Sequence, residues 1–198
     1  MNAAEPRAAA VENAPLVVAF GDSLFAGYRL SRGEGFAPTL ERKLAELGQP
    51  ARIFDASVSG DTSAAGLQRL TYVLDGLPEK PDLVIVGLGS NDMLRGLKPD
   101  DTRKNLTAIL DELDRRDIDV VLAGAVSAPN MGRDYADAFN PIYPDLAERY
   151  GFPLYPFILD GVIGNEKLLL PDGMHPNAKG VERMVSGIGP VVAKALDN

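Results

Sequence analysis

The chain has 198 residues and no cysteine, and its 28 acidic and 20 basic side chains give a formal net charge of −8. The lack of thiols excludes disulfides, thiolate metal sites and a cysteine nucleophile. The acidity argues against nucleic acid as a partner, and no apolar run reaches the roughly 18 residues that a membrane-spanning helix needs. We therefore expect a soluble protein, without integral membrane contact, whose partner is a small molecule.

The start of the chain differs in composition from the rest. Residues 3–15 are rich in alanine, contain two prolines and show little periodicity. We expect residues 1–14 to form a disordered N-terminal arm and residues 15–198 to form a single domain. Alternatively, the arm is what remains after removal of a leader, which would place the protein in the periplasm or outside the cell. Otherwise we expect a cytoplasmic protein.

Segments typical of buried strands alternate with segments whose leucines recur at helical spacing. The expected strands are residues 16–20, 51–58, 82–88, 118–126 and 154–158. The expected helices are residues 36–48, 63–77 and 100–116, a helix ending at Tyr150, and a last helix from Pro176 to Leu196. This alternation predicts the α/β class, as a three-layer α/β/α sandwich with a five-stranded parallel sheet in the flavodoxin-like order 2-1-3-4-5.

Three of the expected strands end in short polar turns. These turns are Gly-Asp-Ser-Leu at residues 21–24, Ser-Gly-Asp-Thr at 59–62 and Gly-Ser-Asn-Asp at 89–92. Taken singly, each is typical of a loop or a helix cap. The carboxyl ends of parallel strands share one edge of the sheet, where ligands bind in such folds. We therefore expect Ser23, Gly60 and Asn91 to meet at one site.

His175 is the only histidine of the chain, and Asp172 precedes it by three residues with a glycine between them. A serine nucleophile needs a base to accept its proton and a group that orients the base. A lone histidine on a surface is usually inert, and Asp172 has the alternative role of a turn or helix-capping carboxylate. The spacing nevertheless allows Asp172 to hold the His175 ring with its outer nitrogen available to a hydroxyl.

Donors for a developing oxyanion are present on the same three turns. The candidates are the backbone N–H groups of Ser23 and Gly60 and the side-chain amide of Asn91, which stays neutral at any working pH. In isolation, Gly60 and Asn91 are better explained by the needs of their own turns.

These turns and the segment 172–176, Asp-Gly-Met-His-Pro, resemble in order and spacing the four sequence blocks of the SGNH (GDSL) hydrolase family. The segments 88–96 and 128–132 are similar to the branch of bacterial arylesterases and of enzymes like thioesterase I and lysophospholipase. The resemblance implies the same flavodoxin-like sheet, a Ser23, Asp172 and His175 triad, and an oxyanion hole made by Ser23, Gly60 and Asn91. Asp55 and Ser90 depart from the residues that this branch often has.

We therefore expect a serine esterase that uses no cofactor and no metal and hydrolyses short- to medium-chain carboxylic esters through an acyl-enzyme. A carbohydrate O-acetyl esterase, or a non-catalytic binding module on the same fold, are the alternatives. The expected substrate-contacting residues lie on the turns and on the loops that leave the later strands. They are Asp22, Met93, Leu94, Asn130, Met131, Phe139, Ile142 and Leu170.

Overall fold

A computed structural model describes residues 14–197, which form an open parallel sheet of five strands in the order β2-β1-β3-β4-β5. The predicted order 2-1-3-4-5 is confirmed. Apart from Ala14, the expected N-terminal arm lies outside the described residues. The strands are β1 (Leu16–Gly21), β2 (Arg52–Asp55), β3 (Leu83–Gly87), β4 (Asp119–Ala123) and β5 (Leu154–Tyr155).

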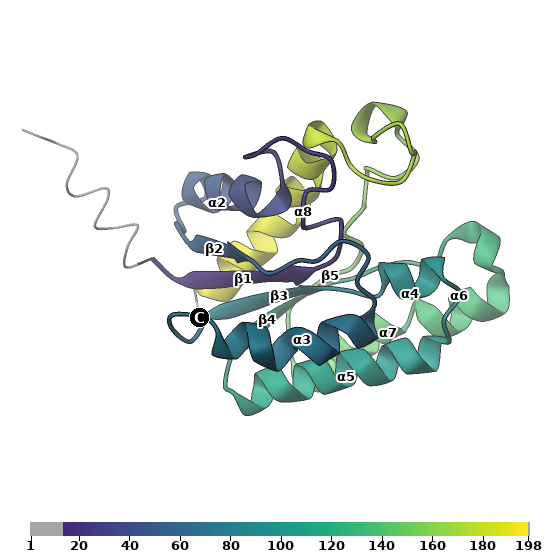
Figure 1. Cartoon of the computed structure of the whole chain (residues 1–198), viewed down its shortest axis with the longest axis horizontal. Coiled ribbons are helices and arrows are strands. Elements are labelled where there is room, and N and C mark those ends of the chain that lie inside the picture. The colour runs from purple at the N-terminus through teal and green to yellow at the C-terminus, as the bar shows by residue number, and fades with distance from the viewer. Residues whose placement is uncertain (1–13, 198) are drawn as a thin grey trace, which may run out of the picture.

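Helices cover both faces of the sheet, so the predicted three-layer sandwich is confirmed (Figure 1). One face carries α2 and α8, and the other carries α3, α5 and α7. The helices are α2 (Phe36–Glu46), α3 (Ser63–Asp75), α4 (Ser90–Leu94), α5 (Pro99–Arg115), α6 (Arg133–Phe139), α7 (Ile142–Tyr150) and α8 (Ala178–Leu196), with short 3-10 turns η1 (Pro129–Met131) and η2 (Glu166–Leu168).

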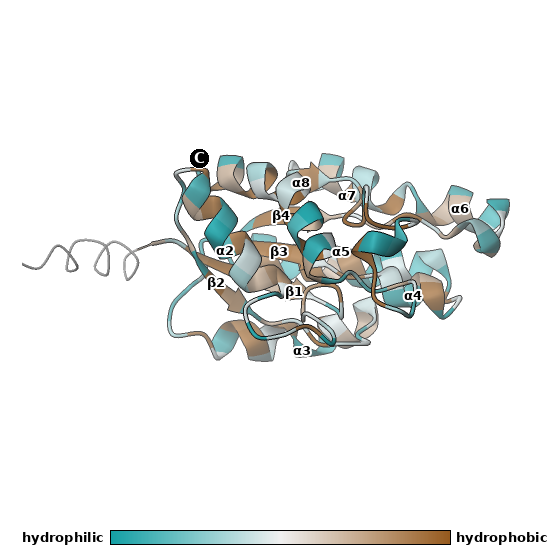
Figure 2. Ribbon diagram, turned by 90° about the horizontal axis from the view of Figure 1, so that it is seen from above, coloured by the Kyte–Doolittle hydropathy of each residue, from teal (hydrophilic) through white to brown (hydrophobic). Residues whose placement is uncertain are grey.

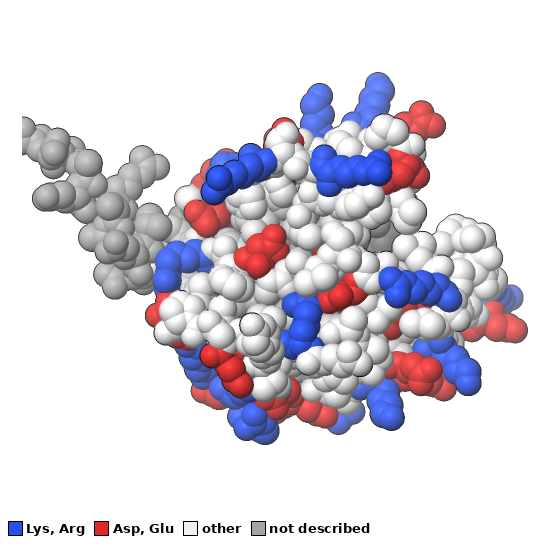
Figure 3. Space-filling view, viewed as in Figure 1, with Lys and Arg blue, Asp and Glu red and all other residues white. Residues whose placement is uncertain are grey.

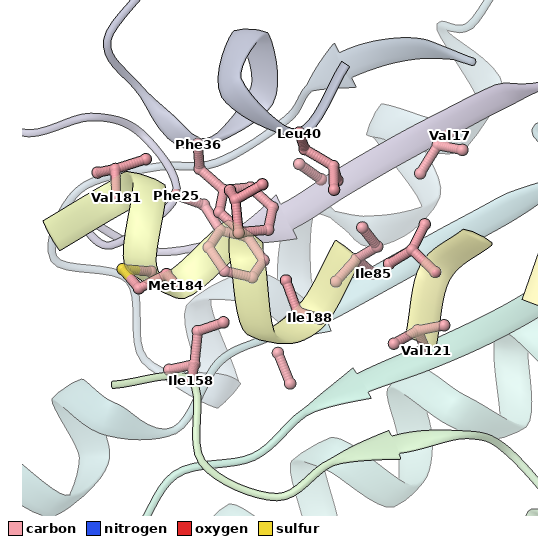
Figure 4. Close-up of a cluster of buried hydrophobic side chains, with 14 of the residues drawn as sticks. Val17, Phe25, Phe36, Leu40, Ile85, Val121, Ile158, Val181, Met184 and Ile188 are labelled. Atoms are coloured by element: carbon pink, nitrogen blue, oxygen red, sulfur yellow. The ribbon is translucent and has the colours of Figure 1, made fainter. Parts of the chain in front are cut away.

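The central strands are buried on both faces because each face of the sheet has its own hydrophobic core. Successive side chains of a strand point to opposite faces. Val17 and Ala19 of β1 accordingly join the core under α2 and α8, whereas Val18 and Phe20 join the core under α3 and α5. Figure 4 shows the first core, and Figure 2 shows the strands as predominantly hydrophobic. Full burial of a side chain as large as Phe20 stabilises the fold by about 1.5–3 kcal/mol.

Several of the expected elements are shorter or divided. The strands expected at 51–58 and 118–126 are only Arg52–Asp55 and Asp119–Ala123. The helix expected to end at Tyr150 is two helices, α6 and α7, because Pro141 lacks the N–H that would continue the helical hydrogen bonds, although Asn140 and Pro141 keep right-handed helical dihedral angles. The strand expected at 154–158 ends at Tyr155, since Pro156 cannot donate to the sheet. The last helix begins at Ala178 rather than at Pro176, because the Asn177 side chain caps it by accepting from the N–H of Gly180 at 3.1 Å.

Charged side chains are distributed over the surface. On the face shown in Figure 3, lysine and arginine are interspersed with aspartate and glutamate. Among residues 14–197, no helix has both the length and the apolar character needed to span a membrane.

Candidate active site

The structure places Ser23 against His175, although 152 residues separate them in the chain. Ser23 follows the carboxyl end of β1, and His175 lies in the loop that leads into α8. The His175 Nε2 atom is 3.0 Å from Ser23 Oγ, and its Nδ1 atom is 2.9 Å from Asp172 Oδ2. When Nδ1 carries the proton and donates it to Asp172, Nε2 is free to accept the serine proton. The predicted triad residues therefore form one continuous hydrogen-bonded chain.

The loop that carries Asp172 holds its carboxylate in a fixed direction. The Oδ1 atom accepts the backbone N–H groups of Met174 and His175, each at 3.0 Å, while Oδ2 remains directed at the imidazole. The backbone N–H of His175 is the main cause that lowers the pKa of Asp172 to about 2, and the Met174 N–H acts in the same direction. Asp172 therefore remains an anion at any pH at which an esterase is assayed.

Asp22 shapes the turn that presents Ser23. Its Oδ1 atom accepts the backbone N–H of Leu24 at 3.0 Å, and its carbonyl accepts the N–H groups of Phe25 and Ala26 at 3.2 and 3.0 Å. Its Oδ2 atom accepts the side-chain amide of Asn91 at 3.1 Å. This bond uses one of the two amide N–H groups of Asn91 and leaves the second for another acceptor. Asp22 is thus the direct link between the Ser23 turn and the Asn91 turn.

Burial is the main cause that raises the pKa of Asp22 from 3.8 to about 6. The bonds from Leu24 and Asn91 and the charge of His175 oppose this rise without cancelling it. The carboxylate form that accepts from Asn91 is therefore dominant only above about pH 6.

The turn at residues 89–92 differs from expectation, and the Gly60 turn has a backbone conformation that favours glycine. Residues 89–92 are not a simple turn, because Ser90–Leu94 form the short helix α4. Gly89 precedes it with a φ of 111°, and a Cβ atom there would lie 2.2 Å from the Tyr143 hydroxyl. Gly60 has a φ of 87°, in the region that favours glycine, and its carbonyl accepts Nη2 of Arg95 at 2.6 Å.

A pocket of about 520 Å³ opens at the Ser23 and His175 pair. Its walls are mainly apolar and come from the carboxyl ends of β1, β3 and β4 and from the loops before α8. Gly60 is not among its lining residues. The lining is Asp22, Ser23, Leu24, Ser90, Asn91, Met93, Leu94, Ala125, Val126, Ser127, Ala128, Pro129, Phe157, Leu159, Ile163, Met174 and His175.

Of the residues expected to contact substrate, Asp22, Met93 and Leu94 line this pocket. Phe139 and Ile142 do not, because both are fully buried in the core beneath α5. The remaining three also lie elsewhere: Asn130 is exposed in η1, Met131 packs against that same core, and Leu170 lines a separate hollow with Glu166 and Pro171.

Sequence reasoning missed two contributions to the site. The Tyr28 ring packs against the His175 ring, with 4.5 Å between the two centroids. Three exposed apolar side chains, Val126, Ile163 and Met174, form part of the pocket wall. The position of Val126 at the end of an expected strand was the available signal for that residue, but nothing in the sequence pairs Tyr28 with His175. Within residues 14–197, no group of three or more His, Cys, Asp or Glu side chains is arranged to hold a metal ion.

The raised pKa of Asp22 predicts a pH-dependent stability. The folded protein holds this proton more tightly than the unfolded chain, so the free energy of unfolding falls as the pH rises from about 4 to about 6. The loss amounts to about 3 kcal/mol. We therefore expect the change in unfolding free energy caused by Asp22→Asn, which stays neutral, to be more favourable by about 3 kcal/mol at about pH 8 than at about pH 4, because the altered contact with Asn91 contributes at both pH values. Urea unfolding at both pH values measures this difference, and an equal effect at both would contradict it.

Comparison with known proteins gives consistent matches over most of the chain. Residues 19–183 match the sequence profile of the GDSL-like lipase/acylhydrolase family. The chain is 36% identical to the esterase TesA of Pseudomonas aeruginosa, over 92% of this chain and 90% of that protein. It is 38% identical to an arylesterase of Vibrio mimicus, over 85% and 83% of the two chains. The crystal structure of AlinE4, an SGNH-hydrolase family esterase, has a TM-score of 0.80 at 51% identity and covers 92% of this chain and 97% of its own.

Proposed function

This chain belongs to the GDSL-like lipase/acylhydrolase family and is a serine esterase, and from this premise we propose that Ser23, His175 and Asp172 carry its chemistry. The observation that supports these roles is the hydrogen-bonded chain from Ser23 Oγ through both ring nitrogens of His175 to Asp172, with steps of 3.0 and 2.9 Å. Each contact is within the distance over which a proton passes between heavy atoms.

In the proposed reaction, Ser23 Oγ attacks the ester carbonyl carbon while His175 Nε2 takes the hydroxyl proton. The imidazolium then gives this proton to the departing alkoxide, and the acyl group remains on Ser23. Water repeats the sequence on the acyl-enzyme and releases the carboxylic acid. Asp172 keeps the proton on Nδ1 and stabilises the positively charged ring of His175. The lowered pKa of Asp172 supports this role, because its carboxylate stays ionised throughout the working pH range.

We propose the backbone N–H groups of Ser23 and Gly60 and the second amide N–H of Asn91 as the oxyanion hole. Asn91 lines the same pocket as Ser23, and its contact with Asp22 fixes the amide plane. Donors of this kind act on charge that appears only in the transition state, so they mainly raise kcat.

Covalent labelling tests the nucleophile directly. An organophosphonate reacts with a serine that a neighbouring base activates, and we expect a stoichiometric adduct on the peptide that carries Ser23. Digestion and mass spectrometry locate the adduct. An adduct on the peptide that carries Ser59 or Ser90 would overturn the assignment.

The pocket favours an acyl chain of about two to eight carbons, because part of the apolar wall that would cover a longer chain is itself exposed to solvent. Leu94, Ile163 and Met174 are each between 41% and 52% exposed, so a longer chain would leave the wall and reach water. This lining also favours a hydrocarbon chain over the hydroxyl-rich ring of an acetylated sugar.

Chain-length selectivity gives a quantitative prediction. Each methylene that the wall covers adds about 0.8 kcal/mol, so kcat/KM for p-nitrophenyl esters is expected to rise up to about eight carbons and then level off or fall. Initial rates below KM across a series from about two to sixteen carbons measure this profile. A value of kcat/KM that continues to rise to the longest ester would show that the acyl chain lies on a longer surface than this pocket.

A further inference from the structure

Asp92 is a buried carboxylate that the proposed reaction does not use. It follows Asn91 in α4, is only 1% exposed, and faces donors from two other helices. Its Oδ2 atom accepts the backbone N–H of Ser63 at 2.7 Å. Its Oδ1 atom accepts the hydroxyl of Ser63 and that of Thr102, the latter at 3.2 Å. Burying a polar side chain is costly unless hydrogen bonds satisfy it, and these donors satisfy both oxygens of Asp92.

The partners of Asp92 connect it to the Gly60 turn. Ser63 is the first residue of α3 and lies three residues after Gly60. Asp92 therefore fixes the point where the chain leaves this turn. Arg95, which follows α4, donates to the carbonyl of Gly60 itself at 2.6 Å. The segment that carries Asn91 thus holds the Gly60 turn at two places.

The hydrogen bonds require a carboxylate rather than an amide. The Ser63 hydroxyl oxygen accepts the side-chain amide of Asn105 at 3.0 Å, so its own hydrogen is directed to Asp92. The backbone N–H of Ser63 occupies the second oxygen. A carboxylate accepts on both oxygens, whereas an asparagine accepts on only one and presents N–H groups on the other side. Among residues 14–197, no buried side-chain nitrogen or oxygen lacks a partner, so Asp92→Asn would introduce a mismatch.

We propose that Asp92 is a positioning residue that sets the distance between the Gly60 N–H and the Asn91 amide. The inference rests on the proposed oxyanion hole, because it assigns these two donors to one oxygen. Asn91 and Asp92 are consecutive, so one end of α4 presents a donor to the pocket while the next side chain holds the turn that carries the other donor. A displacement of the Gly60 turn lengthens a bond that forms only in the transition state, and it therefore lowers kcat rather than raising KM.

The test compares Asp92→Asn with Thr102→Val in the full chain. Thr102→Val removes a buried hydrogen bond to the same carboxylate but leaves both bonds to Ser63 intact. We expect Asp92→Asn to lower kcat about 10- to 100-fold with KM within about threefold, and Thr102→Val to change both by less than about twofold. Thermal unfolding followed by circular dichroism shows whether each variant is folded at the assay temperature. If Asp92→Asn does not fold, Ser63→Ala loosens the same contact, and its kcat is expected to fall several-fold.

A double-mutant cycle separates positioning from a general structural role. Asn91→Ala alone is expected to lower kcat about 10² to 10³-fold. When Asn91→Ala is already present, Asp92→Asn is expected to lower kcat by less than about threefold, because one of the two donors that Asp92 aligns is already absent. The inference would be overturned if the kcat losses of Asn91→Ala and Asp92→Asn were fully additive, or if folded Thr102→Val lost as much kcat as Asp92→Asn. An unchanged kcat in folded Asp92→Asn and Ser63→Ala would also overturn it. An unchanged kcat in Asn91→Ala would overturn the oxyanion hole itself, which is a different failure.

Discussion

Ser23→Ala is expected to lower kcat for ester hydrolysis by roughly 10⁴ to 10⁶-fold, because the oxygen that forms the acyl bond is removed. The effect on folding should be small. The Ser23 side chain is half-buried at the pocket, and its contact with His175 Nε2 joins it to the site rather than to either core. Loss of one such hydrogen bond costs about 1 kcal/mol. Initial rates with a p-nitrophenyl ester, together with thermal unfolding, separate the two effects.

Ser59→Ala is the matched control for this substitution. Ser59 is an exposed serine that follows β2 near the same edge of the sheet, and it does not line the pocket. Its loss is expected to change kcat by less than a few-fold. If Ser23→Ala retained more than a small fraction of the activity, or if Ser59→Ala removed it, the nucleophile would have to be reassigned.

The Ser23 turn and the Asp172 and His175 pair could be predicted because the sequence patterns that encode them are local, whereas the approach of His175 to Ser23 across 152 residues was implied by the family resemblance. An apolar run identifies β1, its break places Ser23 at the edge of the sheet, and a three-residue spacing joins Asp172 to His175. A parallel sheet then requires the polar ends of neighbouring strands to meet at one edge. The same alternation of strand and helix predicts a parallel sheet, and the order 2-1-3-4-5 is one of the two common orders of such sheets.

The lining of the pocket could not be predicted in the same way. Phe139 and Ile142 are apolar residues in a region expected to be a helix near the site, and only the packing of α6 and α7 against α5 decides that they face the core. Val126 and Met174 are apolar residues that face solvent at the pocket instead. A hydrophobic pattern does not distinguish a core from a pocket, because both are lined by the same residue types.

The network around Asp92 shows a second limit of pattern reasoning. Asp92 lies in a polar motif whose chemistry points to Asn91, its neighbour, and its own partners come from α3 and α5. Ser63 and Thr102 are 29 and 10 residues away along the chain. Nothing local in the sequence indicates these contacts, because they depend on how three helices pack at the end of the sheet.

Asp172→Asn is expected to lower kcat by roughly 10³ to 10⁴-fold while the loop keeps its shape. The side-chain oxygen of asparagine can still accept the backbone N–H groups of Met174 and His175, as Oδ1 does now. Its NH₂ group would then face His175 Nδ1 and donate to it. The ring would carry its proton on Nε2, directed at Ser23, and would be unable to accept the serine proton.

The impairment of this variant is expected to be independent of pH between about pH 5 and pH 8. Because the pKa of Asp172 is lowered to about 2, its protonation does not contribute to any loss of activity between about pH 5 and pH 8. Asp172→Asn should therefore remain impaired across that whole range, and raising the pH should not restore it. Asp160→Asn, which removes a surface carboxylate paired with Arg183 at 3.3 Å, is the control for charge and should leave kcat nearly unchanged. If Asp172→Asn retained kcat within about tenfold at neutral pH, Asp172 would serve mainly to shape the loop, and His175 would need another partner to orient it.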